Sequence, residues 1–176
     1  MAGYRKLGRR NDVRFSILRN LTTELIVNGK IKTTVDRAKE VQKIAEKLIT
    51  EAAKVSDNFS TREVLVSAAK TDKDNKKILN EAVSKSGHTY YKVERELSTK
   101  EVQVDDPARL AARRRAMTWL NKSKDAEGNA VSPVNILFNE LATRYKDVNG
   151  GYTRIVPLGT RRGDSAEMCI LQLIEL

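Results

Sequence analysis

The 176-residue chain has little of what disulfide-bonded domains and most enzyme active sites need. It contains one cysteine, Cys169, and one histidine, His88. A single cysteine cannot form an internal disulfide, and its apolar surroundings are typical of a small buried side chain. The sequence also lacks the spacing of a metal site, and no nucleophile stands beside a base. We therefore predict no catalysis, no metal, no cofactor and no small-molecule substrate.

Long apolar runs and aromatic residues are also scarce. No apolar run approaches the roughly eighteen residues of a membrane-spanning helix. The basic N-terminal stretch has no apolar segment after it, which argues against a secretory signal. Aromatic residues make up 5% of the chain, too few to predict a platform that stacks single-stranded bases. We expect a cytoplasmic protein that makes no membrane contact.

Positive charge is what the sequence has in excess. The formal net charge is +10, which predicts an anionic partner such as nucleic acid. Residues 1–54 contain 13 Lys and Arg against 6 Asp and Glu, residues 55–106 contain 9 against 10, and residues 107–176 contain 11 against 7. The last segment favours arginine, whose guanidinium binds phosphate through two hydrogen bonds. Both ends are therefore expected to hold phosphates.

Apolar periodicity predicts two helices in the first third of the chain. The first is capped by Asn11 or Asp12 and ends near Asn28, with Gly29 as its stop. A short strand over 30–35 follows, and a second helix begins at Thr34 or Asp36. The apolar stripe of this second helix comprises Ala38, Val41, Ala45, Leu48, Ala52 and Val55. Packing on a sheet of the same domain explains such a stripe.

Two further helices and a hairpin are predicted in the last third. One helix is capped by Asp105 or Asp106 with Pro107 in its first turn, and the next is capped by Ser132 with Pro133 at its first position. Their expected buried residues are Ala108, Ala112, Ala116, Trp119 and Leu120 in the first, and Val134, Leu137, Phe138, Leu141 and Tyr145 in the second. The terminal hairpin is centred on the loop PLGTRRGDS, and its last strand is expected to be central.

The middle of the chain has a weaker pattern. Residues 61–85 look helical, and residues 89–104 alternate as two short strands would. The predicted fold is α+β, with about four helices packed on one face of a small mixed β-sheet. Residues 1–10 are expected to be a basic flexible arm. Residues 11–176 are expected to form one domain, interrupted at about 55–106 by an inserted subdomain.

Clustered arginines are the candidate binding residues. Arg113 and Arg114 belong to a run of three arginines, which in isolation is most often a solvated helix face. Their position in a positively charged segment favours phosphate binding. Arg161 and Arg162 lie on a loop tip between two apolar strands, where they meet water or a partner. Because aromatics are few, we expect contacts to the backbone of a nucleic acid and little direct reading of its bases.

Two long blocks carry a family resemblance. The segments YRKLGRRNDVRFSILRNLTTELIVNGKIKTTVDRAKEV and FNELATRYKDVNGGYTRIVPLGTRRGDSAEM resemble the ribosomal protein seventeen family of the bacterial large subunit. The resemblance implies an α+β protein that binds large-subunit ribosomal RNA near the outer mouth of the nascent-chain exit tunnel. It also implies ribosomal proteins twenty-two and thirty-two as neighbours, and no catalysis. No homo-oligomer is expected.

The same resemblance implies a set of RNA-facing residues. By matching position these are Arg5, Lys6, Arg9, Arg10, Arg14, Arg19, Lys32, Lys39, Arg154, Arg161 and Arg162. The stretch at about 55–106 is much longer than in shorter relatives, and its near-zero charge fits an extension that does not touch RNA. A free DNA-binding or nucleoid-associated protein remains the alternative that the charge alone allows.

Overall fold

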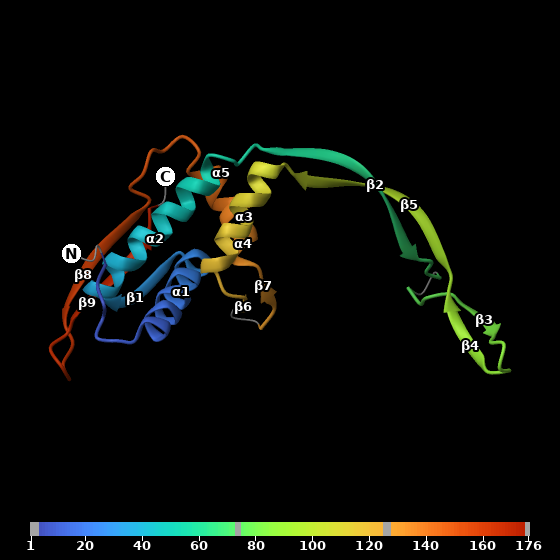
Figure 1. The fold of residues 1–176 in the computed structure, drawn as a ribbon, viewed down its shortest axis with the longest axis horizontal. Coiled ribbons are helices and arrows are strands. Elements are labelled where there is room, and N and C mark those ends of the chain that lie inside the picture. Colours follow the sequence, from blue (N-terminus) through green and yellow to red (C-terminus); the bar gives the residue numbers. More distant parts are fainter. Residues whose placement is uncertain (1–3, 73–74, 125–127, 175–176) are drawn as a thin grey trace. The chain divides into compact units, whose positions relative to one another are not determined.

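The computed structural model describes residues 4–72, 75–124 and 128–174, and Figure 1 shows its fold. The chain divides into two units, one formed by residues up to 58 and from 105 onward, the other by Phe59–Val104. Within the described residues no helix is long and apolar enough to cross a membrane. Helices and small antiparallel sheets occur together, so the predicted α+β class is confirmed.

Helix α1 spans Asn11–Asn28 and ends as predicted. Gly29 follows it in the left-handed region with φ of 73°, and its N–H donates to the Leu25 carbonyl. The predicted cap is wrong, because the N-cap residue is Arg10 and no side chain caps the helix. The carboxylate of Asp12 instead accepts a hydrogen bond from the Arg10 guanidinium at 3.2 Å.

Helix α2 spans Val35–Ala53 and has the predicted apolar stripe. The five stripe positions inside the helix are buried, and Val55, which follows the helix, is half-buried and packs against the core. Thr34 is the N-cap residue, although its hydroxyl makes no capping bond. α2 contacts all three strands of the larger sheet, so this helix joins the apolar face of that sheet to the other helices.

Helix α3 spans Pro107–Trp119 and has Pro107 in its first turn, as predicted. Asp106 is the N-cap residue without a capping side-chain bond. Of the expected buried face, Ala112, Ala116 and Leu120 are buried and Trp119 is half-buried. The prediction is wrong for Ala108, which is exposed. The next residue along, Arg109, is buried in its place, with a relative exposure of 3%.

The next helical segment runs over residues 133–144 in three parts. These are α4 (Pro133–Ile136), the π-helical turn η1 (Leu137–Leu141) and α5 (Ala142–Arg144). The five residues of its predicted stripe are all buried. A π-helical turn is a local widening that periodicity in the sequence does not reveal. A two-stranded hairpin, β6 (Ser123–Lys124) and β7 (Ala130–Val131), precedes this segment.

The larger sheet has the order β1–β9–β8, with strands Lys30–Thr34, Glu167–Leu173 and Thr153–Thr160. β9 is central, as predicted. The predicted mixed sheet is wrong, because both pairings are antiparallel. β8 and β9 form a hairpin, and β1 runs against the other edge of β9. A register irregularity between Pro157 and Gly159 lets β8 continue to Thr160, so the hairpin loop is shorter than expected.

The unit Phe59–Val104 is built from strands. β2 (Phe59–Ala69) pairs with β5 (Arg95–Asp105), and β3 (Leu79–Val83) pairs antiparallel with β4 (Thr89–Val93). Two strands were correctly predicted over 89–104, whereas the helix predicted over 61–85 is wrong. Alanines and lysines there favour a helix, but cross-strand partners override that local preference.

Candidate nucleic-acid interface

The register of the larger sheet collects positive side chains on one of its faces. Lys30 pairs with Gln172 in β9, and Gln172 pairs in turn with Arg154 in β8. Two residues further along β1, Lys32 pairs with Ile170. Successive side chains of a strand point to opposite faces, so these five residues share one face, which we name the open sheet face. Its two rows contain three cations and no carboxylate.

The opposite face of the sheet is closed. Ile31, Cys169 and Leu171 alternate with the residues of the open sheet face, and all three are buried beside α2. The three cations of the open sheet face are exposed instead. Their side chains have no ion pair or hydrogen bond within the described residues. They are therefore available to an anionic partner without breaking any contact of the fold.

A polar hollow of about 560 Å³ lies at one end of the open sheet face. Its lining includes Lys30, Arg144 and Arg154, and none of the described residues that line it is acidic. Arg144 is exposed and, in the part of the chain that the structure describes, its guanidinium has no partner. Neither Lys30 nor Arg144 was predicted. The alternation of Lys30 with Lys32 was the available signal, whereas only the fold brings Arg144 beside Arg154.

The two arginines of the hairpin loop have different surroundings. Arg161 Nε donates to Asp164 Oδ1 at 2.8 Å, and Arg161 Nη2 donates to the other carboxylate oxygen. The Ala166 N–H also donates to Asp164, at 3.3 Å. These hydrogen bonds, that of Arg161 foremost, lower the pKa of Asp164 to about 2. Arg162 is exposed, and no described residue pairs with its guanidinium.

Part of the basic N-terminal segment is held against the helices. Arg5 forms ion pairs with Asp36 at 3.0 Å and Glu40 at 3.3 Å. Leu7 packs against the hydrophobic core. Lys6 and Arg9 are exposed and have no side-chain partner among the described residues. Residues 1–3 of the predicted arm lie outside the described residues, and the flexibility of the arm stays a prediction.

Arg14 lies inside the structure and not on its accessible surface. Its relative exposure is 6%. The guanidinium carbon lies 4.3 Å from the ring centre of Tyr4 and 4.9 Å from that of Phe15, which are cation–π contacts. Arg14 Nη1 donates to the Arg5 carbonyl at 3.3 Å, whereas Nε has no acceptor. The sequence alone does not reveal this inward position.

The remaining candidates separate by whether they are already paired. Arg19, Lys39 and Arg114 are exposed, and their side chains have no partner within the described ranges. Arg113 is paired with Asp105 at 3.1 Å and also donates to Asn135. In the described part of the molecule, no three His, Cys, Asp or Glu side chains gather as a metal site requires. The geometry is that of a dispersed cationic surface.

Comparisons with known proteins agree on one family. The sequence model of ribosomal protein L17 matches residues 17–174. The large ribosomal subunit protein bL17 of Acetivibrio thermocellus is 53% identical over 174 residues, which cover 99% of this chain and 100% of the relative. The bL17 of Ruminiclostridium cellulolyticum has the same identity and coverage. That of Lachnospira eligens is 42% identical over 183 residues, with 99% and 100% covered.

Proposed function

Because the chain belongs to the ribosomal protein L17 family, we propose that it is a structural constituent of the bacterial large ribosomal subunit and organises its RNA through phosphate contacts. The family expected from the sequence is confirmed by the match over residues 17–174 and by relatives aligned along their whole length. These relatives are aligned through residues 55–106 as well, so the long central stretch is not peculiar to this chain.

The open sheet face is the observation that carries the proposal. Three exposed cations on two rows, without a carboxylate between them, form a surface that repels cations and attracts a polyanion. Many hydrogen bonds between proteins and nucleic acids run from arginine and lysine side chains to phosphate oxygens. The cations of this face are available for such contacts, because no described side chain neutralises them.

We extend the proposed contact surface to the unpaired cations predicted from the sequence and to Arg144, which lines the polar hollow. It comprises Lys6, Arg9, Arg19, Lys30, Lys32, Lys39, Arg114, Arg144, Arg154 and Arg162. A second group of proposed contacts consists of arginines whose guanidinium is already paired with a carboxylate. These are Arg5, Arg10, Arg113 and Arg161. Arg14 is left out of the direct contacts, since its side chain is covered.

The finer placement rests on the family. We propose that the protein lies in the cytoplasm on the solvent side of the subunit, near the outer mouth of the nascent-chain exit tunnel. Ribosomal proteins twenty-two and thirty-two are its proposed neighbours. The insert at about 55–106 is proposed to extend over the surface of the subunit without binding RNA, which agrees with its nearly balanced charge.

Salt-dependent binding to a large-subunit rRNA transcript tests the proposal. Each phosphate contact contributes about 0.7–0.9 to the slope of log affinity against log salt. Replacing Lys30, Lys32 and Arg154 by alanine should therefore lower the slope by about two to three. Lys85→Ala, which removes an exposed lysine of the unit Phe59–Val104, is the control and should leave the slope unchanged. An unchanged slope in the triple variant would contradict phosphate binding by this face.

Cell fractionation separates the proposal from the DNA-binding alternative. A ribosomal protein should sediment with large subunits through moderate salt. Recovery with the chromosome, and loss from the subunit fraction, would favour the free DNA-binding protein instead. The triple variant serves here too, because it should shift the protein from the subunit fraction to the soluble fraction as salt rises.

A further inference from the structure

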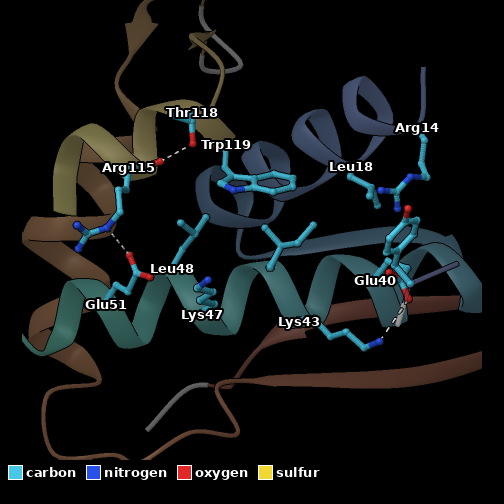
Figure 2. A pocket seen from close by; sticks show the side chains of 12 residues that line it. Arg14, Leu18, Glu40, Lys43, Lys47, Leu48, Glu51, Arg115, Thr118 and Trp119 are labelled. Atoms are coloured by element: carbon cyan, nitrogen blue, oxygen red, sulfur yellow. Dashed lines mark hydrogen bonds and ion pairs between the residues drawn. The ribbon is translucent and has the colours of Figure 1, made fainter. Parts of the chain in front are cut away.

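A second hollow, of about 420 Å³, lies among α1, α2 and α3 (Figure 2). Its apolar lining comprises the side chains of Leu18, Ile44, Leu48 and Trp119 and the ring of Tyr4. Figure 2 shows Trp119 facing the residues of α2, with Leu18 and Arg14 contributed by α1. Small-ligand sites usually measure roughly 300–1,000 Å³, so this hollow can admit a flat ring of the size of a nucleobase.

The rim of this hollow has a net positive charge. Its two acidic residues are already neutralised, because Glu40 pairs with Lys43 at 3.4 Å and Glu51 pairs with Arg115 at 3.2 Å. Glu40 is paired with a second cation from the N-terminal segment as well. Lys47, which also lines the hollow, is exposed and has no partner among the described residues. An occupant whose negative group lies beside Lys47 would therefore neutralise this remaining cation.

Arg14 adds a further positive charge to the wall of the hollow. Its guanidinium packs on the rings of Tyr4 and Phe15, and its Nε is covered and has no hydrogen-bond partner. Because Nε is covered, an occupant of the hollow cannot accept a hydrogen bond from it. The contribution of Arg14 is therefore its charge, which favours an occupant with a negative group.

We propose that this hollow holds the base of a single unpaired nucleotide of large-subunit RNA. The inference rests on the proposed function, since rRNA is then the available ligand. The base would lie on the apolar floor beside Trp119, and its phosphate would contact Lys47. An aliphatic side chain from a neighbouring protein fits the floor alone and leaves the charge of Lys47 unmatched. One such site is compatible with the scarcity of aromatic residues in the chain.

Trp119 is the only tryptophan in the chain, so its fluorescence reports on this hollow directly. A short oligoadenylate should quench its emission as it binds, because a base stacks beside the indole. An abasic oligomer with the same number of phosphates should bind more weakly and leave the emission unchanged. Trp119→Leu should weaken oligoadenylate binding, followed by anisotropy of a labelled oligomer, roughly tenfold.

The Lys47→Ala variant provides a second test of the site, which does not depend on whether the Trp119→Leu variant folds. It should weaken oligoadenylate binding and lower the salt slope by about 0.7. Lys54→Ala, an exposed lysine just after α2, is the matched control and should do neither. Unquenched Trp119 emission together with equal affinities of the two lysine variants would overturn the inference, and an apolar segment of a neighbouring protein would then be the better occupant. The proposed function fails separately, if the large-subunit rRNA transcript does not bind at all.

Discussion

At the scale of single residues, the pairing of each arginine decides how much charge it can offer to a phosphate. Arg113 and Arg114 are neighbours in sequence, yet the first is paired with Asp105 and the second is unpaired within the described residues. Arg161 and Arg162 differ in the same way, because only Arg161 is bound to Asp164. Adjacent cations that look equivalent in the sequence therefore differ in their availability.

The Arg161–Asp164 pair gives a pH-dependent prediction. Its carboxyl has an ordinary pKa of 3.8 and a lowered pKa of about 2 in the folded hairpin. Because the pKa is lower in the folded than in the unfolded state, the pair stabilises the fold at pH values above about 3.8. This contribution to stability is lost as the pH falls from about 3.8 through about 2. NMR titration of Asp164 should give a midpoint near 2 in the native chain, and Arg161→Ala should move it upward. An unchanged titration midpoint of Asp164 in the Arg161→Ala variant would mean that the pair does not form in solution.

Cys169 should be inert in the folded protein. Its side chain lies on the core face of β9 and has no measurable exposure, and burial raises the pKa of its thiol. Both effects reduce the population of reactive thiolate. Native protein at mildly alkaline pH should therefore react with a thiol reagent far more slowly than protein unfolded in denaturant. Equal rates in the two states would place this thiol at the surface.

At the scale of elements, Arg109 joins α3 to two neighbouring segments. Arg109 Nη1 donates to the Ser56 carbonyl at 2.9 Å, Arg109 Nη2 donates to Asn139 Oδ1 at 3.2 Å, and Asp105 lies 3.1 Å from Nε. This cation is 3% exposed, so its removal takes away the buried hydrogen bond to the Ser56 carbonyl and leaves Asp105 paired with Arg113 alone. The sequence suggests only that Arg109 shares a helix side with Arg113, and does not reveal that it is structural.

Arg109→Ala should reduce the free energy of unfolding by about 3–5 kcal/mol, because it removes two hydrogen bonds from a charged donor that contribute about 1.5–3 kcal/mol each. Denaturant unfolding followed by circular dichroism measures this change. The control is Arg114→Ala on the same helix, which removes an exposed arginine and should change stability by less than about 0.5 kcal/mol. Similar losses in the two variants would show that the buried hydrogen bonds contribute little.

How well each element could be predicted depends on its amphipathicity. α2 and the segment over 133–144 have stripes that match their buried faces, because both pack on a core within the same unit. β2 has no such signal, since all but two of its residues are exposed and nothing in the local sequence distinguishes its alanines from those of a helix. Cross-strand pairing with β5, distant in sequence, decides its structure.

The candidate interface was predictable only in part, for a related reason. Positive charge in the terminal segments follows directly from composition, and Lys32 and Arg154 were found by family resemblance. The grouping of Lys30, Arg144 and Arg154 depends on strand register and on the end of the segment over 133–144, which no local pattern specifies. Arg14 was assigned to the RNA-facing set by family resemblance, which does not reveal that its side chain is covered.

At the scale of the whole molecule, charge and architecture are distributed differently between the two units. The unpaired cations proposed to bind RNA all belong to the unit formed by the two ends of the chain. The unit Phe59–Val104 consists of two-stranded pairings with many exposed apolar side chains, among them Leu65, Val83, Tyr91 and Leu97. Its surroundings on the subunit are therefore expected to be apolar in part, unlike the phosphate surface proposed for the rest.

The junction of the two units makes their independence testable. We name the unit formed by residues up to 58 and from 105 onward the terminal unit. Its Asp106 N–H donates to the Asn58 carbonyl at 3.1 Å, so the residues that precede and follow the other unit in the chain lie side by side. A two-residue Asn-Gly turn can therefore replace residues 59–104 while Asp105 is kept to pair with Arg109. This shortened chain should unfold cooperatively and bind the large-subunit rRNA transcript with an unchanged salt slope.

Two outcomes of this deletion would contradict the division of roles. A folded variant whose slope falls by about one or more would show that the insert provides phosphate contacts. Failure to fold would show that the terminal unit depends on the insert for its core. The expected result follows from the structure of the terminal unit, because its helices, its three-stranded sheet and all its proposed RNA contacts lie outside the deleted segment. The matched test in the subunit is incorporation of the shortened chain, which should equal that of the full chain at low salt.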